Sequence, residues 1–227
     1  MSKTKSVVST SRNLFIPSDR VQLEGELSIP KEAAGIVLFA HGSGSSRHSP
    51  RNKYVAQTLR ESHIGTLLFD LLTMDEEDED RYTRYLRFNI DLLVRRLVDA
   101  TRWIKTQEEV RQLPIGYFGS STGAAAALVA AAELGEQVAV VVSRGGRPDL
   151  AGASLPLVKA PTLLIVGGFD EPVIRLNWDA YKQLRCEKKV EIVDRATHLF
   201  EEPGALEEVA WLASEWFKKH FEAARTG

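Results

Sequence analysis

The chain has 227 residues, of which 44% are hydrophobic and 26% are charged, and these values fit a single α/β domain with a sizeable core. Its formal net charge of −2 argues against nucleic acid as a partner, and the single cysteine, Cys186, excludes an intrachain disulfide. The polar N-terminus lacks the apolar run of a signal peptide, and no run approaches membrane-spanning length, so we expect a cytoplasmic protein that does not enter membranes.

The chain is expected to begin with a flexible polar segment, residues 1–12, followed by one domain over residues 13–227. Residues 13–16 and 21–29 are β-rich. In the second stretch, apolar residues alternate with polar ones, which is typical of a half-buried strand. The two stretches together predict a hairpin at a sheet edge.

From residue 36 onward, short apolar runs alternate with helical patterns. Runs that are apolar on both faces are typical of parallel strands covered by helices, and they occur at 36–40, 65–69, 115–118, 138–142 and 162–166. A last short strand is expected at 191–193, and helical spacing is clearest over 85–103 and 206–220. The alternation predicts an α/β fold with a doubly wound, mostly parallel sheet and helices on both faces.

Two serines lie side by side in the sequence Gly-Ser-Ser-Thr-Gly, residues 119–123. The stretch lies between an apolar strand run and an alanine-rich helix, which is the context of a nucleophile elbow. This turn is so tight that only small residues fit beside the nucleophile, and Gly119 and Gly123 meet that demand. The pattern predicts Ser121, its central residue, as the nucleophile. The alternative is a glycine-rich turn that only packs a helix on the sheet.

A serine hydroxyl needs a neighbouring base to become a nucleophile. His198 lies between the last strand and the last helix, at the carboxyl edge of the sheet, where ligands bind in open α/β sheets. Asp170 follows the 162–166 run at the same edge and is predicted to hold the tautomer of this histidine. Asp170 could instead cap the helix that begins beside Pro172, and Asp149 is the alternative acid.

Acyl transfer also needs hydrogen-bond donors for the oxyanion. One donor is expected to be the backbone N–H of Thr122, which follows the nucleophile. The second is expected in the run His-Gly-Ser-Gly-Ser-Ser at 41–46, where we assign the amide of Ser43 and place Gly42 in contact with substrate. The run lacks the Lys-Ser/Thr ending of a Walker motif, which argues against a nucleotide site.

Several segments resemble the small α/β-hydrolases grouped with the dienelactone hydrolases. The resemblance covers roughly residues 13–222 and rests on HGSGSS, GSSTG, VVSRGGRPDLAG, LLIVGGFDEP and ATHLFEEPGALEEVA. It implies an α/β-hydrolase fold and a serine hydrolase with neither cap domain nor cofactor, and it assigns nucleophile, acid and base to Ser121, Asp170 and His198, in the chain order described for this fold. The dienelactone hydrolases proper use a cysteine where this chain has Ser121, so dienelactone itself is not implied as the substrate.

Charged segments near the predicted site have two interpretations each. Residues 75–80, Asp-Glu-Glu-Asp-Glu-Asp, are interpreted as a solvated acidic loop, with a rim that repels anionic substrates as the alternative. Arg144 and Arg147 follow a strand at the active edge, where they either contact a carboxylate-bearing substrate or pair with Asp149 or the acidic run. No carboxylate or cysteine completes a metal set with the two histidines of 41–48, so no metal is expected.

The sequence therefore predicts an esterase-type hydrolase that cleaves small carboxylic esters or lactones through an acyl-enzyme on Ser121. The alternatives are acyl transfer or perhydrolysis by the same residues, and a non-catalytic binding protein on a hydrolase scaffold. Other proteins of the α/β-hydrolase fold commonly carry large caps between the strands that here end near Ser143 and begin near Thr162. The short 144–161 stretch predicts a shallow open cleft and short-chain substrates. A homodimer whose second subunit covers the cleft is the alternative.

Overall fold

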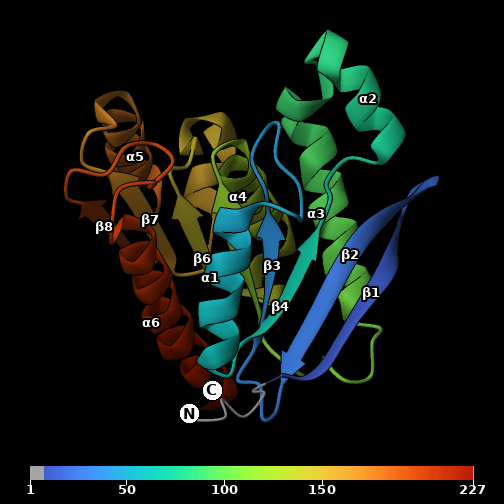
Figure 1. Ribbon diagram of the computed structural model, residues 1–227. Coiled ribbons are helices and arrows are strands. Elements are labelled where there is room, and N and C mark those ends of the chain that lie inside the picture. The colour runs from blue at the N-terminus through green and yellow to red at the C-terminus, as the bar shows by residue number, and fades with distance from the viewer. Residues whose placement is uncertain (1–7, 227) are drawn as a thin grey trace.

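The computed structural model describes residues 8–226, which form one mixed β-sheet between two layers of helices (Figure 1). The strands are β1 (Val8–Ser18), β2 (Val21–Pro30), β3 (Ile36–Ala40), β4 (Gly65–Phe69), β5 (Ile115–Ser120), β6 (Val138–Arg144), β7 (Thr162–Gly167) and β8 (Lys188–Val193). The α-helices are α1 (Pro50–Glu61), α2 (Met74–Thr83), α3 (Ile90–Ile104), α4 (Thr122–Leu134), α5 (Glu171–Gln183) and α6 (Ala205–Thr226). Short 3-10 helices are η1 (Leu86–Phe88), η2 (Gly135–Gln137) and η3 (Pro148–Leu157).

The eight strands follow the order β1-β2-β4-β3-β5-β6-β7-β8. All pairings from β4 to β8 are parallel, whereas β1 pairs with β2, and β2 with β4, in antiparallel fashion. The predicted doubly wound sheet and its edge hairpin are thus confirmed. The carboxyl ends of β3, β5, β6, β7 and β8 meet at one edge, so the loops that follow these strands are neighbours.

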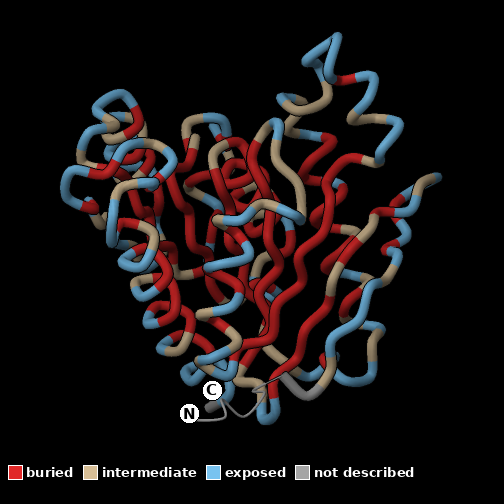
Figure 2. The backbone as a smooth tube through the Cα atoms, in the orientation of Figure 1, coloured by how far each residue is buried: buried red, intermediate tan, exposed pale blue. Residues whose placement is uncertain are grey.

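Each face of the sheet buries its own apolar cluster. One cluster joins the sheet to α3, α4 and α5, and the other joins it to α1 and α6. In β5, Tyr117 belongs to the first cluster and the next residue, Phe118, to the second, because side chains alternate across a strand. This is why the central strands read as continuous apolar runs, and Figure 2 shows them buried along their length.

Two predicted boundaries were wrong. Strand β1 begins at Val8, so residues 8–12 pair with β2 although they were expected to be flexible; residues 1–7 lie outside the described part of the chain. The long helix expected from residue 85 begins at Ile90 instead. The side chain of Asn89 accepts a hydrogen bond from the amide of Leu92 and so caps α3, separating it from η1.

No helix within residues 8–226 is both long and apolar enough to cross a membrane. In the same range, no group of three or more His, Cys, Asp or Glu side chains is arranged to hold a metal ion.

At its two glycines, the turn from β5 into α4 leaves room for nothing larger than a hydrogen atom. A Cβ atom on Gly119 would lie 2.5 Å from the Cα of Ala124, and one on Gly123 would lie 2.1 Å from the carbonyl oxygen of Ala40. Both contacts involve backbone atoms, which cannot turn aside as a flexible side chain can. The start of α4 therefore packs directly against the end of β3.

The substitution Gly123→Ala should destabilise the fold. The added methyl group must push α4 away from β3, and overpacking of this kind typically costs about 1–3 kcal/mol, with larger costs where backbone is displaced. We expect the free energy of unfolding in urea to fall by at least that amount. The exposed Glu133→Ala on the same helix should change it by less than about 0.5 kcal/mol. Equal stability of Gly123→Ala and wild type would contradict the close contact.

The buried His41 ties the loop after β3 to the loop after β4. Its Nδ1 lies 3.0 Å from the carbonyl oxygen of Gly42, and its Nε2 lies 3.0 Å from the amide nitrogen of Leu71. A carbonyl oxygen only accepts and an amide only donates, so the ring carries its hydrogen on Nδ1 and is neutral. Burial lowers the pKa of His41, although the carbonyl of Gly42 and the carboxylate of Asp70 act in the opposite direction.

The contribution of His41 to stability should therefore disappear in acid. Its pKa in the folded state lies below the ordinary value of about 6.5, so the unfolded chain takes up the proton first as pH falls. We expect the stability difference between wild type and His41→Asn to be largest above about pH 6.5 and to shrink toward pH 5 in urea titrations. A difference that stays constant over this range would contradict a neutral, buried His41.

Candidate active site

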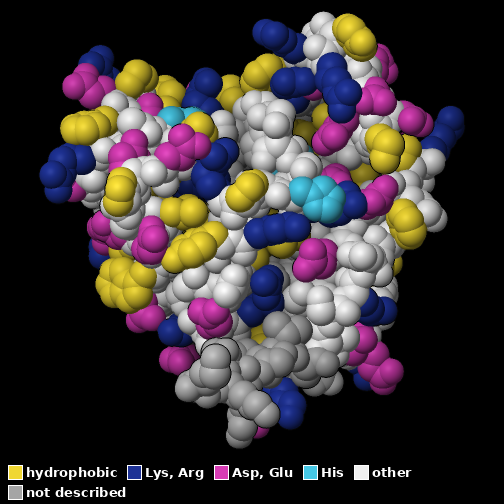
Figure 3. Space-filling view, viewed as in Figure 1, with side chains coloured by type: hydrophobic (Ala, Val, Ile, Leu, Met, Phe, Trp, Pro, Cys, Tyr) yellow, Lys and Arg dark blue, Asp and Glu magenta, His cyan; other side chains and the backbone are white. Residues whose placement is uncertain are grey.

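The predicted site residues gather at the carboxyl edge of the sheet. In Figure 3 the surface is hollowed at this edge, between the part formed by α2 at the upper right and the part formed by α5 and its neighbouring loops at the upper left. The loops that follow β3, β5, β6, β7 and β8 all lead into this region. This is the edge at which open α/β sheets bind ligands.

Ser121 occupies a strained position between β5 and α4. Its φ of 50° and ψ of −120° are rare for a residue with a side chain. Three backbone hydrogen bonds hold it there: its amide donates to the carbonyl of Arg144 at 3.3 Å, and its carbonyl accepts from Arg147 at 3.0 Å and Ala124 at 3.1 Å. Strain held in place by surrounding structure is characteristic of functional sites, and the geometry is that of a nucleophile elbow.

Asp170 and His198 form a short hydrogen bond across the β7 and β8 loops. The Nδ1 of His198 lies 2.6 Å from Oδ2 of Asp170, whose side chain is only 12% exposed. Asp170 occupies the N-cap position of α5, yet its side chain makes no capping hydrogen bond to the helix. The Asp170 side chain therefore does not cap α5, the alternative role that the sequence left open. It bonds to His198 instead.

A glycine at the end of β6 allows His198 to approach the elbow. Gly145 has a φ of +52°, and a Cβ atom on it would lie 3.2 Å from the carbonyl oxygen of His198 and 3.6 Å from its Cε1. The preceding residue, Arg144, is the one whose carbonyl accepts the amide of Ser121. Ser121 and His198 therefore both lie beside the segment Arg144–Gly145, although they are 77 positions apart in the sequence.

The loop at 41–46 lies against the elbow from the β3 side. The amide of Ser43 donates to Oγ1 of Thr122 at 3.0 Å, and a Cβ atom on Gly42 would lie 3.0 Å from the Cβ of Ser121. The far end of the loop is anchored by the amide of Arg47, which donates to Oδ1 of Asp70 at 2.6 Å. The Ser43 amide thus points toward the residue that follows Ser121, as an oxyanion donor in this loop would have to.

Arg144, the last residue of β6, and Arg147 in the following loop are engaged by protein groups. Arg144 is 6% exposed, and its Nη2 donates to Oγ of Ser120 at 3.1 Å and to Oδ1 of Asn52 at 3.4 Å. Burial lowers the pKa of Arg144 to about 10. Arg147 forms a two-point ion pair with Asp149, at 2.9 and 2.8 Å, so the alternative acid is already engaged. The expected contact of Arg144 with substrate is therefore replaced by a supporting role beneath the elbow.

The acidic run at 75–80 is part of a helix, which corrects its interpretation as a solvated loop. Thr73 and Glu76 form a capping box at the start of α2, where acidic residues also interact favourably with the helix dipole. Asp80 is 1% exposed and bonds to the amide of Leu86 and to the side chain of Arg87. The spacing of the carboxylates gave no sign that one of them is buried.

A cavity of about 350 Å³ opens between α2, α3 and the loop at 41–46. The sequence predicted site contacts for this loop and offered the acidic run at 75–80, which contains Glu77 and Asp80, as a rim of the site. The remaining lining residues carried no sequence signal, and they are Leu72, Arg81, Arg87 and Leu93. No large domain interrupts the chain between β6 and β7, where residues 148–157 form η3. Helix α2 supplies a wall of this cavity opposite the loop at 41–46.

Comparison with known proteins supports the fold assignment. A crystal structure of dienelactone hydrolase from Anabaena variabilis ATCC 29413 is 59% identical, with a TM-score of 0.91 over 93% of this chain and 98% of that one. Est1E from Butyrivibrio proteoclasticus is 16% identical with a TM-score of 0.77 over 92% of this chain and 99% of that one, a likeness in fold alone.

A curated relative has a different name and a greater length. A Mycobacterium tuberculosis protein named "Putative phosphoribosyl transferase" (strain ATCC 25618 / H37Rv) is 56% identical over 200 residues, which are 88% of this chain but 44% of the relative. The chain thus spans less than half the length of that relative. The model of the dienelactone hydrolase family matches residues 28–222, nearly the whole domain. The chain belongs to the dienelactone hydrolase family.

Proposed function

We propose that the protein is a serine esterase that hydrolyses small carboxylic esters or lactones through an acyl-enzyme on Ser121. The observation that carries the proposal is the 2.6 Å hydrogen bond between His198 and Asp170, formed beside a serine held at positive φ. A serine becomes nucleophilic when a base takes its proton, and the base is effective when a carboxylate fixes its tautomer.

Each residue has a definite part in the proposed reaction. Asp170 accepts the Nδ1 hydrogen of His198, which leaves Nε2 without a hydrogen and able to take the proton of Ser121. Oγ of Ser121 then attacks the ester carbonyl, and the carbonyl oxygen becomes an oxyanion held by the amides of Thr122 and Ser43. His198 returns the proton to the leaving alcohol. Water, deprotonated by the same nitrogen, then attacks the acyl carbon. The bond to Oγ breaks, the acid leaves, and His198 returns the proton to Ser121.

The oxyanion site is partly occupied in the resting structure. The amide of Ser43 donates to the hydroxyl oxygen of Thr122, which is 2% exposed. In the proposed reaction the substrate oxygen replaces this hydroxyl as the acceptor, so the exchange is of one hydrogen bond for another. The hydrogen bond from the Ser43 amide is stronger to an oxyanion than to a neutral hydroxyl, which favours the transition state over the resting enzyme.

Two alternatives are less well supported by the site. Acyl transfer would use the same first half-reaction and differ only in the acceptor that replaces water. Phosphoribosyl transfer appears in the name of relatives of which the chain covers only 44%, and the family match over residues 28–222 covers a hydrolase-type domain. A Ser–His–Asp arrangement offers a route to acyl transfer and none specific to a ribose phosphate.

The substitution Ser121→Ala should reduce esterase activity on p-nitrophenyl acetate by several orders of magnitude, since the residual catalysis of such sites is only about 10³–10⁴ over water. The matched control is Ser120→Ala. Its hydroxyl is buried and directed to Arg144 and Asn52, so this variant should still turn over and should react with a fluorophosphonate probe. Probe labelling at Ser120, or full turnover by Ser121→Ala, would refute the assignment.

The acid can be tested by two matched carboxylate-to-amide changes. Asp170→Asn should lower kcat by up to about 10⁴-fold, because the amide stabilises the wrong tautomer of His198. Asp149→Asn removes only the partner of Arg147 and should have a small effect. Steady-state kinetics of both variants on one ester decide the matter. If Asp149→Asn proved the more damaging, Asp170 would not be the acid.

A further inference from the structure

The cavity beside the oxyanion loop has the size of a small ligand site. Its volume of about 350 Å³ lies in the range of pockets that hold small molecules. Gly42 and Ser43 form part of its wall, and a Cβ atom on Gly42 would lie 3.0 Å from the Cβ of Ser121. Gly42 therefore borders both the cavity and the residue proposed above as the nucleophile, which brings the cavity within reach of a substrate bound at Ser121.

A buried ion pair sets the shape of the cavity wall. The carboxylate of Asp80 accepts from the amides of Leu86 and Arg87, at 2.7 and 3.3 Å, and from Nε of Arg87, whose Nη2 bonds to the Asp80 carbonyl at 3.0 Å. Burial by itself would raise the pKa of Asp80, but these hydrogen bonds lower it below its ordinary value. The carboxylate is therefore ionised and fully engaged, and the guanidinium is held at two of its three nitrogens.

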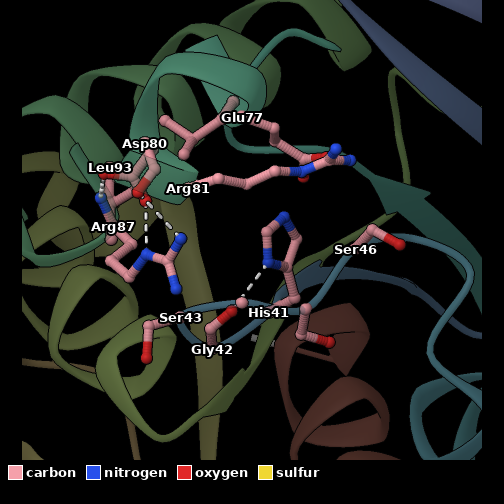
Figure 4. A pocket seen from close by; sticks show the side chains of 12 residues that line it. His41, Gly42, Ser43, Ser46, Glu77, Asp80, Arg81, Arg87 and Leu93 are labelled. Carbon is pink, nitrogen blue, oxygen red and sulfur yellow. Dashed lines mark hydrogen bonds and ion pairs between the residues drawn. The ribbon is translucent and has the colours of Figure 1, made fainter. Parts of the chain in front are cut away.

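The third nitrogen of Arg87 faces the oxyanion loop. A Cβ atom on Gly44 would lie 3.5 Å from Nη1, and no side chain or carbonyl within the described residues accepts a hydrogen bond from this nitrogen. Figure 4 shows the guanidinium of Arg87 between Asp80 and the Gly42–Ser43 segment, directed into the cavity. A rigidly held donor without a protein acceptor is available to an oxygen atom of a ligand.

The charges around the cavity argue against an anionic ligand group. The charge of Arg87 is balanced by Asp80, and the other two charged residues of the lining, Arg81 and Glu77, have opposite signs. His41 is neutral, so the lining carries no net charge. The pKa of Glu77 is raised by its burial and by the neighbouring Asp70.

From these observations we infer that the cavity is a substrate subsite in which Nη1 of Arg87 donates a hydrogen bond to an uncharged oxygen of the ester. The substrates of this site are then small esters or lactones that carry an ether, hydroxyl or ketone oxygen away from the scissile bond. This inference rests on the proposed esterase function. It makes Arg87 a specificity-determining residue and Asp80 the residue that positions it.

The test compares p-nitrophenyl esters in pairs of equal length. In each pair one acyl chain has an ether oxygen where the other has a methylene group, and the oxygen is placed two, three or four atoms from the carbonyl carbon. For each protein, kcat/KM of the ether ester is divided by kcat/KM of its alkyl partner. The ratio for wild type is then divided by the ratio for a variant. Intrinsic reactivity of the esters cancels in this double ratio.

Two variants guard against a folding defect. Arg87→Lys keeps the ion pair with Asp80 but loses Nη1, and the double variant Asp80→Asn with Arg87→Gln replaces the buried charges by two amides that can bond to each other. Arg95→Gln, an exposed arginine of α3, is the control for a change of charge. For at least one oxygen position, the ether preference of wild type should fall about ten-fold or more in both Arg87 variants and stay unchanged in the control, as expected for a lost hydrogen bond from a charged donor.

The outcomes separate this inference from the proposed function. Wild-type protein that neither reacts with a fluorophosphonate at Ser121 nor hydrolyses any ester of the panel would overturn both. Wild-type protein that does both, but whose ether preference is the same in every variant, would overturn the subsite alone. A stronger wild-type preference for a terminal carboxylate ester, lost in Arg87→Lys, would overturn the choice of an uncharged oxygen.

Discussion

The contact between the start of α4 and the end of β3 is the constraint on which the rest of the site depends. A hydrogen atom at Gly123 faces the carbonyl oxygens of Ala40 and His41 at a distance that no methyl group could occupy. This contact brings the turn after β5 against the loop after β3. Beside it, Ser121 has a positive φ, and Thr122 lies within hydrogen-bond distance of the Ser43 amide. The proposed nucleophile and oxyanion donors are thus brought together by packing of backbone on backbone.

The layer beneath the elbow is polar, which is unusual for the interior of a sheet protein. Arg144 is buried there and bonds to Ser120 and Asn52, and its guanidinium lies 5.7 Å from the centre of the Phe200 ring. Its Nε has no hydrogen-bond partner within the described residues. A buried cation held only by neutral groups is costly, and this one lies beside the segment shared by Ser121 and His198. Its field favours negative charge at the elbow, where the proposed reaction develops it.

Helix α2 gives this small domain a pocket wall without an inserted cap domain. The helix follows β4 and stands above the sheet edge, as Figure 1 shows, and its residues face the loop at 41–46. Two of its carboxylates make different contacts. Glu76 caps the helix and pairs with Arg96, whereas the buried Asp80 bonds to the amide of Leu86 in the segment that leads to α3. A sequence of high charge thereby forms a structured wall.

The sequence by itself determined the order of strands and helices along the chain and the position of the elbow. It also determined the choice of Ser121, Asp170 and His198 as candidate site residues. These features depend on local rules: apolar runs form buried strands, glycines mark the tight turn, and a residue after a parallel strand lies at the carboxyl edge. Only the tertiary structure decided what Arg144, Asp80 and Arg87 do. Whether a charged side chain is solvated or buried depends on which distant segments pack against it. Here Asn52 bonds to Arg144, and the 41–46 loop lies beside Arg87. Local sequence carries no record of that choice, because the same charged residues would form an exposed helix in another fold.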